Sequence, residues 1–140
     1  MRSCAAAIGG SLRICLIDDD VVVLEALAMG LRDAGYDVRS ASGAAAGLDL
    51  IAHGGIDIII TDLNMPGMSG AQLIAEARAR WLHLPIVAIS GMREGDGRTT
   101  SDAARALGAD GMLQKPFRAS DLDQIIQSVL QSRRNARQAR

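Results

Sequence analysis

Aromatic side chains and lysine are scarce in this chain of 140 residues, which contains one phenylalanine, one tyrosine and one tryptophan. Lysine occurs once, as Lys115, in a sequence that otherwise uses arginine as its strong base. Apolar residues nevertheless make up 49% of the chain. The core must therefore be filled by Ala, Leu, Ile, Val and Met, a composition that favours closely packed helices on a sheet.

Cysteine and long apolar runs are also too few to indicate a secreted or membrane protein. The two cysteines, Cys4 and Cys15, give no disulfide framework, and Cys15 lies in an apolar run where it acts as a small hydrophobe. No stretch approaches the ~20 apolar residues of a membrane span, and residues 1–8 lack the apolar core of a signal peptide. We expect a cytoplasmic protein that makes no contact with a membrane.

Charge of either sign is not in excess. The chain has 15 Lys and Arg against 16 Asp and Glu, a formal net charge of -1. This balance supplies no general attraction for nucleic acid. We therefore expect partners that recognise local surfaces, without direct binding to nucleic acid.

Five short apolar runs recur, and each is followed by a segment of helical periodicity. This alternation is typical of parallel strands joined by helical crossovers and predicts an α/β fold, with the most apolar run as its central strand. The predicted strands are Leu12–Ile17, Asp37–Ala41, Asp57–Thr61, Ile86–Ile89 and Gly111–Leu113. The predicted helices are Asp20–Ala34, Gly43–His53, a helix that Ser69 caps and that ends near Arg80, Thr99–Leu107, and Ser120–Ser132.

One domain is expected over residues 11–132, between a flexible extension at 1–10 and a basic tail at 133–140. Asp20 and Ser69 are predicted helix N-caps, since their side chains can accept a hydrogen bond from the first turn. Gly35 and the pair Gly54 and Gly55 follow predicted helices, where glycine favours a left-handed stop. The expected inner stripe of the first helix is Leu24, Leu27, Ala28 and Leu31.

Polar side chains directly follow the predicted strands. In an open parallel sheet, ligands bind beyond the carboxyl ends of the strands, so these residues converge on one edge. Carboxylates crowded there repel one another unless a cation lies between them, and oxygen ligands suit Mg²⁺ where Zn²⁺ requires His or Cys. The converging residues are Asp18, Asp19, Asp20, Asp62, Ser90 and Lys115.

Lys115 is notable as a compact ammonium in an arginine-rich chain. It can pair with Asp62 and then with a phosphoryl oxygen, to which Ser90 on the neighbouring strand can donate its hydroxyl. Asp20 adjoins the acidic pair, but we expect it to cap the helix that follows rather than to bind metal.

Four motifs occur in order: Leu-Ile-Asp-Asp-Asp at 16–20, Thr-Asp-Leu-Asn-Met-Pro-Gly-Met-Ser-Gly at 61–70, Ile-Ser-Gly at 89–91 and Gln-Lys-Pro-Phe at 114–117. Together they resemble the CheY-like receiver domain of bacterial two-component response regulators, over about Leu12 to Leu130. The resemblance implies a flavodoxin-like, doubly wound (βα)5 fold, with a five-stranded parallel sheet in order 2-1-3-4-5 and helices on both faces. It also implies a signalling switch, not an enzyme, which catalyses only its own phosphorylation and dephosphorylation.

The same resemblance assigns roles to individual residues. Asp62 would be the phosphoacceptor, Lys115 its charge partner and Ser90 the hydroxyl that turns toward the acyl phosphate, with a cis peptide bond between Lys115 and Pro116. The donor would be a phosphohistidine on a sensor histidine kinase or a histidine phosphotransfer protein.

Mg²⁺ is the cofactor that the resemblance implies. Asp19 and Asp62 would bind it through their side chains and Asn64 through its backbone carbonyl, whereas Asp18 would act mainly through a metal-bound water.

Met112 departs from the family pattern, because family members often carry an aromatic residue three positions before the lysine. Methionine is flexible enough to occupy two packings, so Ser90 and Met112 are the predicted switch residues. The switch would act on a downstream protein through the face formed by helix Thr99–Leu107, the fifth strand and the last helix.

Two alternatives stay open. A pseudo-receiver would share the fold but act as an interaction module without phosphorylation. A haloacid-dehalogenase-type phosphatase would use Asp18-Asp19-Asp20-Val21-Val22 as its nucleophile loop, with Asp18 as the nucleophile. Phosphate on Asp62 rather than on Asp18 would distinguish the receiver from the phosphatase.

Overall fold

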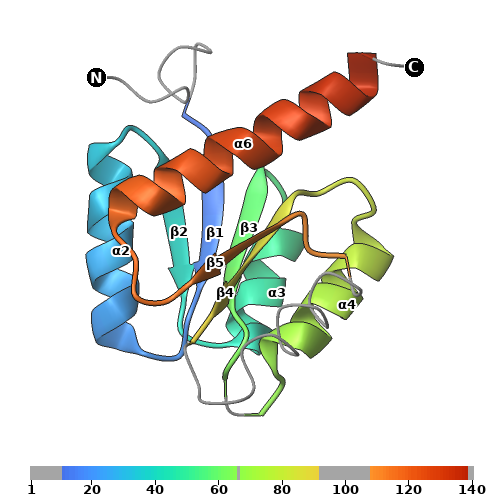
Figure 1. The fold of residues 1–140 in the computed structure, drawn as a ribbon. Helices are drawn as coiled ribbons and strands as arrows, with labels where there is room; N and C mark the ends of the chain where they lie inside the picture. The colour runs from blue at the N-terminus through green and yellow to red at the C-terminus, as the bar shows by residue number, and fades with distance from the viewer. Residues whose placement is uncertain (1–10, 66, 92–107, 139–140) are drawn as a thin grey trace.

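The computed structural model describes residues 11–65, 67–91 and 108–138, which form a parallel sheet with helices on both faces (Figure 1). The strand order is β2-β1-β3-β4-β5. This confirms the predicted α/β class, the doubly wound topology and the central third strand. The strands are β1 (Arg13–Ile17), β2 (Asp37–Ala41), β3 (Ile58–Asp62), β4 (Ile86–Ser90) and β5 (Gly111–Gln114). The described helices are α2 (Val21–Asp33), α3 (Ala44–Ala52), α4 (Gly70–Arg80) and α6 (Ala119–Gln138).

Alternate side chains of each central strand enter two separate cores. Ile14 and Leu16 of β1 lie in the cluster covered by α2 and α6, whereas Cys15 and Ile17 lie in the cluster covered by α3 and α4. Figure 1 shows the two helix pairs on opposite sides of the sheet. Strands covered on both faces must be apolar at every position, which explains the continuous apolar runs in the sequence.

Side-chain caps fix the starts of two helices at the carboxyl edge of the sheet. Oδ1 of Asp20 accepts hydrogen bonds from the N–H groups of Val22 at 3.0 Å and Val23 at 3.3 Å. Ser69 and Gln72 form a reciprocal capping box at the start of α4. Both predicted N-caps are confirmed, so the loops that leave β1 and β3 end at defined points.

The predicted helix stops are confirmed too. Gly35, which follows α2, has a φ of 103°, and Gly54 and Gly55 beyond α3 have φ values of 88° and 85°. Glycine adopts this left-handed backbone without the steric cost of a Cβ. The buried residues of α2 are the four expected ones, Leu24, Leu27, Ala28 and Leu31.

Three strands end one residue later than predicted: β5 ends at Gln114 instead of Leu113, and two others end on polar residues that follow the apolar runs. β3 includes Asp62 and β4 includes Ser90. Apolar residues mark only the buried part of a strand, whereas the backbone hydrogen bonds continue beyond it: the N–H of Leu63 donates to the carbonyl of Ile89 at 2.9 Å, and that of Lys115 donates to the carbonyl of Ser90 at 2.8 Å. The sheet itself therefore holds the backbone of these two polar residues.

The last helix is also longer than predicted, because α6 continues to Gln138 instead of ending at Ser132. Nη2 of Arg133 lies 2.8 Å from Oδ1 of Asp110, whose Oδ2 lies 2.9 Å from Nη2 of Arg78. This ion-pair chain joins α6 to the start of β5 and to α4. A contact between residues 23 positions apart leaves no trace in local periodicity.

The predicted helix Thr99–Leu107 and the extension at 1–10 lie outside the described residues. The division of the chain at residue 132 stays a prediction. Among the helices that the structure describes, none combines the length and hydropathy that a membrane crossing requires.

Candidate functional site

Two buried aspartates lie at the carboxyl ends of adjacent strands. Asp18 directly follows β1 and is 1% exposed, and Asp62 ends β3 and is 4% exposed. β1 and β3 pair in parallel with Ile17 opposite Thr61, so the next residue on each strand lies beside the other. The sheet therefore brings these two carboxylates together, although they are far apart in the sequence.

Each carboxylate is oriented by the main chain two residues ahead. Oδ1 of Asp18 accepts a hydrogen bond from the N–H of Asp20 at 2.9 Å, and Oδ1 of Asp62 accepts one from the N–H of Asn64 at 3.1 Å. Aspartate commonly makes such local turns with its own backbone. These bonds use one oxygen of each carboxylate and leave Oδ2 available.

Lys115 approaches both of the remaining oxygens. Its Nζ lies 3.3 Å from Oδ2 of Asp62 and 3.7 Å from Oδ2 of Asp18. Its peptide bond with Pro116 is cis, as the resemblance implied. One ammonium between two carboxylates leaves a negative charge uncompensated.

Burial and the close charges together change the pKa values of two of these groups. Burial raises the pKa of Asp18; the N–H of Asp20 opposes this rise and the charge of Asp62 adds to it. Burial acts against the ammonium form of Lys115, but attraction by Asp62 and Asp18 outweighs it, so the pKa of Lys115 is raised. Lys115 is therefore a permanent positive charge at neutral pH.

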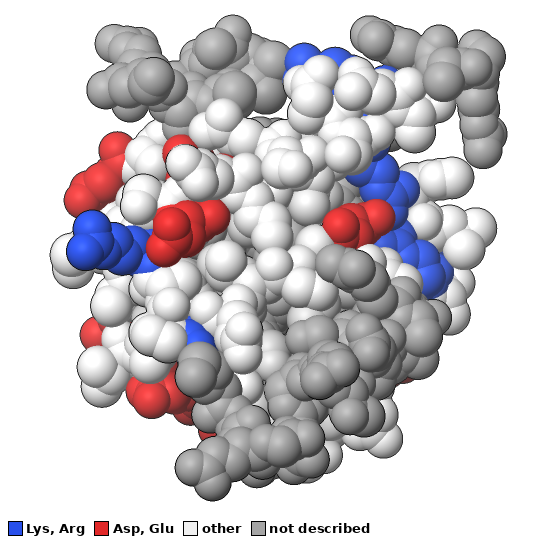
Figure 2. All heavy atoms as spheres, in the orientation of Figure 1, with Lys and Arg blue, Asp and Glu red and all other residues white. Residues whose placement is uncertain are grey.

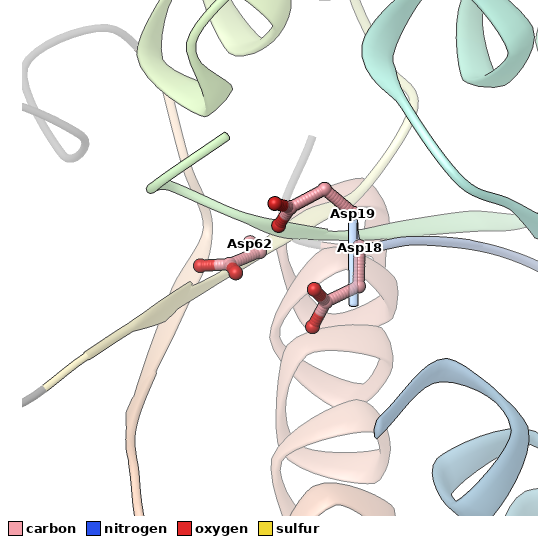
Figure 3. A group of neighbouring side chains, drawn as sticks. All are labelled: Asp18, Asp19 and Asp62. Carbon is pink, nitrogen blue, oxygen red and sulfur yellow. The ribbon is translucent and has the colours of Figure 1, made fainter. Parts of the chain in front are cut away.

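A third carboxylate completes an acidic cluster. Asp19 is exposed, yet one oxygen each from Asp18, Asp19 and Asp62 lies within 4.8 Å of the others. Figure 3 shows the three side chains gathered at the ends of β1 and β3. Oδ2 of Asp18 is buried and accepts no hydrogen bond from any described residue. An unsatisfied anionic oxygen beside two further carboxylates fits a hard divalent cation that prefers oxygen ligands.

Ser90 and Asn64 lie at the same edge of the sheet. Ser90 is buried, and its Oγ donates to the carbonyl of Gly91 at 3.3 Å. Asn64 is exposed and contacts Asp62 through its N–H, so metal binding by its carbonyl stays a prediction. Met112 of β5 is partly buried against the cluster beneath α3 and α4, and its switching role stays a prediction too.

Gly70 contributes to the site although its sequence position suggested no role. A Cβ at this first residue of α4 would lie 2.1 Å from the carbonyl oxygen of Asp62 and 2.5 Å from Cα of Leu63. The helix can therefore approach the phosphoacceptor candidate this closely only because residue 70 has no side chain. The sequence held one sign of this role: a glycine at the first position of a predicted helix, although many other residues have a higher helix propensity than glycine.

A family model described as "Response regulator receiver domain" matches residues 14–127. The chain therefore belongs to this family, the receiver domains of two-component response regulators. The transcriptional regulatory protein FixJ of Azorhizobium caulinodans is 39% identical over 107 residues, which cover 76% of this chain and 49% of that protein. The chain thus spans about half the length of the curated relatives that it matches.

Solved receiver structures share the fold. A receiver domain protein from Clostridium thermocellum is 28% identical with a TM-score of 0.81, and the match covers 89% of this chain and 98% of that one. The chemotaxis protein CheY4 of Vibrio cholerae is 27% identical with a TM-score of 0.79, over 86% of this chain and 99% of that one. The resemblance inferred from the four motifs is confirmed.

Proposed function

We propose that this receiver domain is a phosphorylation-activated switch in which Asp62 accepts a phosphoryl group. The strongest support is the position of Lys115, whose Nζ lies 3.3 Å from Asp62 and 3.7 Å from Asp18. A carboxylate with one oxygen fixed by a backbone N–H and the other beside an ammonium keeps a single orientation, which favours attack on a bound phosphorus. The proposed donor is a phosphohistidine on a sensor histidine kinase or a histidine phosphotransfer protein.

In the proposed step, a carboxylate oxygen of Asp62 attacks the phosphorus. The new O–P bond forms as the P–N bond to the donor imidazole breaks, and the electron pair of that bond stays on the imidazole nitrogen. Lys115 keeps its proton, and its charge stabilises the phosphoryl oxygens. Ser90 then donates its hydroxyl to one of these oxygens in place of the carbonyl of Gly91. Hydrolysis of the acyl phosphate resets the switch.

Mg²⁺ is the cofactor we propose for this step. Asp19, Asp62 and the backbone carbonyl of Asn64 would hold it, with Asp18 acting through a bound water. When bound, it supplies positive charge against the repulsion between the acidic cluster and an incoming phosphoryl group. The buried, unsatisfied Oδ2 of Asp18 supports this assignment.

The test is to incubate the protein with acetyl phosphate, with and without Mg²⁺, and to measure its intact mass over time. We expect one added phosphoryl group per chain, dependent on Mg²⁺, and none on the variant Asp62→Asn, which keeps the fold by circular dichroism. Peptide mapping after chemical reduction of the acyl phosphate locates the label. Equal labelling of Asp62→Asn would refute the assignment.

The two alternatives give different results in the same experiment. Phosphate on Asp18 would favour a haloacid-dehalogenase-type phosphatase. No label, together with an amide NMR spectrum that Mg²⁺ and beryllofluoride leave unchanged near Ser90 and Met112, would favour a pseudo-receiver. We propose that this chain is not an enzyme that acts on other molecules and that it catalyses only its own phosphorylation and dephosphorylation.

For output, we propose a protein target that binds the face of predicted helix 99–107, β5 and α6. Among the side chains coloured in Figure 2, acidic and basic groups are interspersed and form no extended basic field. The formal net charge of -1 favours contact with a protein over direct contact with nucleic acid. Cytoplasmic location and the absence of membrane contact stay predictions.

A further inference from the structure

Gly30 of α2 directly faces the first residue of α6. A Cβ at position 30 would lie 2.7 Å from Cβ of Ala119, well inside the roughly 3.5–4.0 Å at which carbon atoms pack. The two helices are therefore closer here than any side chain at position 30 would allow. An alanine at this position requires them to separate by about 1 Å.

The first turn of α6 follows Lys115 after a short connection, residues 116–118. The chain is tied to the fold just before and within this connection: the N–H of Lys115 donates to the carbonyl of Ser90 at 2.8 Å, and Phe117 packs against the cluster under α2 and α6. The connection is therefore short and held in place by these contacts. Since only residues 116–118 separate Lys115 from Ala119, we expect a displacement of Ala119 to be taken up by this segment and so to change the position of the Lys115 side chain.

A second contact holds α6 beside α2 one turn later. The hydroxyl of Tyr36, just after α2, donates to the carboxylate of Asp123. Ala119 and Asp123 are four residues apart and so lie on the same side of the helix. Crowding at residue 30 acts on the turn nearest Lys115, because the Tyr36 contact holds the next turn in place.

We infer that Gly30 and Ala119 form a positioning contact for Lys115: the missing side chain at residue 30 lets α6 begin where the lysine can reach Asp62 and Asp18. Gly30 touches neither carboxylate and acts only through the start of α6. This inference rests on the proposed phosphoryl transfer to Asp62, and it names a residue outside the site that sets the rate of that transfer.

The experiment adds, removes and exchanges one methyl group in this contact. In the wild type, the only methyl group in this contact belongs to Ala119 of α6. Gly30→Ala adds a second one from α2, and Ala119→Gly removes the one that is present. The double variant again has a single methyl group, now carried by residue 30 of α2. Gly43→Ala is the matched control, because a Cβ at residue 43 meets nothing within 4 Å and the backbone there is extended.

Two properties are measured for each variant. The first is the initial rate of labelling by acetyl phosphate in Mg²⁺. The second is the NMR resonance of the lysine Cε in the metal-free protein, which is a single signal because the chain has one lysine. That signal reports the surroundings of Lys115 directly, and a loss of global stability alone does not move it.

We expect Gly30→Ala to slow labelling roughly tenfold, within the hundredfold that a misplacement of about 1 Å can cost, and to shift the lysine resonance. Ala119→Gly should have a smaller effect in the same direction, because the contact that holds the first turn is lost. The double variant should restore both properties, and Gly43→Ala should change neither. In a Lys115→Ala background, Gly30→Ala should cause no further slowing.

Three results would overturn the inference: a normal rate and resonance in Gly30→Ala, no recovery in the double variant, or the same slowing with and without Lys115. If Gly30→Ala does not fold, Ala119→Gly and the double variant still decide the question, and unchanged properties in Ala119→Gly would count against the inference. If the wild-type protein takes no label, the proposed function fails, whereas the lysine resonance still tests the contact.

Discussion

Replacing Asp18 by asparagine should stabilise the metal-free protein, although it damages the proposed metal site. With an effective dielectric constant of about 20, Asp18 and Asp62, which have oxygens within 4.8 Å of each other, repel by at least about 3.5 kcal/mol, and Lys115 at 3.7 Å attracts Asp18 by about 4.5 kcal/mol. These two terms nearly cancel, and Asp19 adds further repulsion. What remains is the cost of burying an anionic oxygen that accepts no hydrogen bond from a described residue, about 1–3 kcal/mol.

Asparagine removes this cost while keeping the local turn. Its side-chain oxygen can still accept from the N–H of Asp20, and its amide N–H can donate to Asp62. We therefore expect Asp18→Asn to raise the free energy of unfolding by about 2 kcal/mol at neutral pH.

The gain should depend on pH in a direction that the pKa fixes. Burial raises the pKa of Asp18 above its ordinary value of 3.8, so the folded protein keeps this proton at pH values where the unfolded chain has lost it. The stability of the wild type therefore falls as the pH rises from the ordinary value through the raised one. The advantage of Asp18→Asn should be smallest in acid and complete at neutral pH.

Urea unfolding in the presence of a chelator measures the effect, with a shift in midpoint and an unchanged slope. The exposed substitution Asp49→Asn, at a side chain that is 76% exposed, removes the same charge and should stay within about 0.5 kcal/mol of the wild type. Saturating Mg²⁺ should stabilise the wild type more than Asp18→Asn and so reduce the difference. A destabilised Asp18→Asn protein at neutral pH, or a gain of equal size in acid, would refute the reasoning.

Three further predictions concern packing, ion pairing and burial in the fold. Gly70→Ala should cost about 1–3 kcal/mol in urea unfolding, because its Cβ would lie 2.1 Å from a main-chain oxygen and this outweighs the helix propensity of alanine; an unchanged midpoint would contradict the close approach. Asp110→Ala should lower the free energy of unfolding by about 2–3 kcal/mol, because its carboxylate accepts hydrogen bonds from several donors. Arg133→Ala should lower it by less than about 1 kcal/mol, because this arginine is a single, partly exposed partner. Equal losses in the two variants would argue against this ranking. Burial raises the pKa of Cys15 to about 12, so in a Cys4→Ser background its thiol should react with an aromatic disulfide at pH 8 only after unfolding, and prompt reaction in native buffer would contradict its burial.

Much of the fold could be predicted because local and global requirements agree along this chain. The stripe of Leu24 and Leu27 on α2 follows helical spacing and packs on the sheet as expected. Asp20 and Ser69 cap helices because their side chains serve the backbone nearest to them. The convergence of Asp18 and Asp62 followed from a general property of parallel sheets, whose carboxyl ends share one edge.

The features that were missed depend on contacts between different elements of the fold. The extension of α6 beyond Ser132 is supported by the pairing of Arg133 with Asp110, and Gly70 is explained only by its approach to the backbone of Asp62. Strand ends were short by one residue because hydrophobic patterning does not report backbone hydrogen bonds of polar residues such as Ser90. In each case, the deciding partner belongs to another helix, strand or connection, which periodicity within a single element does not report.

The electrostatics of the site account for both the stability that we expect Asp18 to cost and the proposed reactivity of Asp62. Asp18 and Asp62 each satisfy one oxygen through a backbone N–H and share Lys115 as the cation beside the other, which is the oxygen that a metal ion or a phosphorus atom would need. A second fixed cation beside Lys115 would satisfy those oxygens and stabilise the fold, but it would also occupy the space that Mg²⁺ and the phosphoryl group require. The uncompensated negative charge is thus the property that allows the site to respond to a cation and a phosphoryl donor, and the predicted gain in Asp18→Asn measures what it costs in stability.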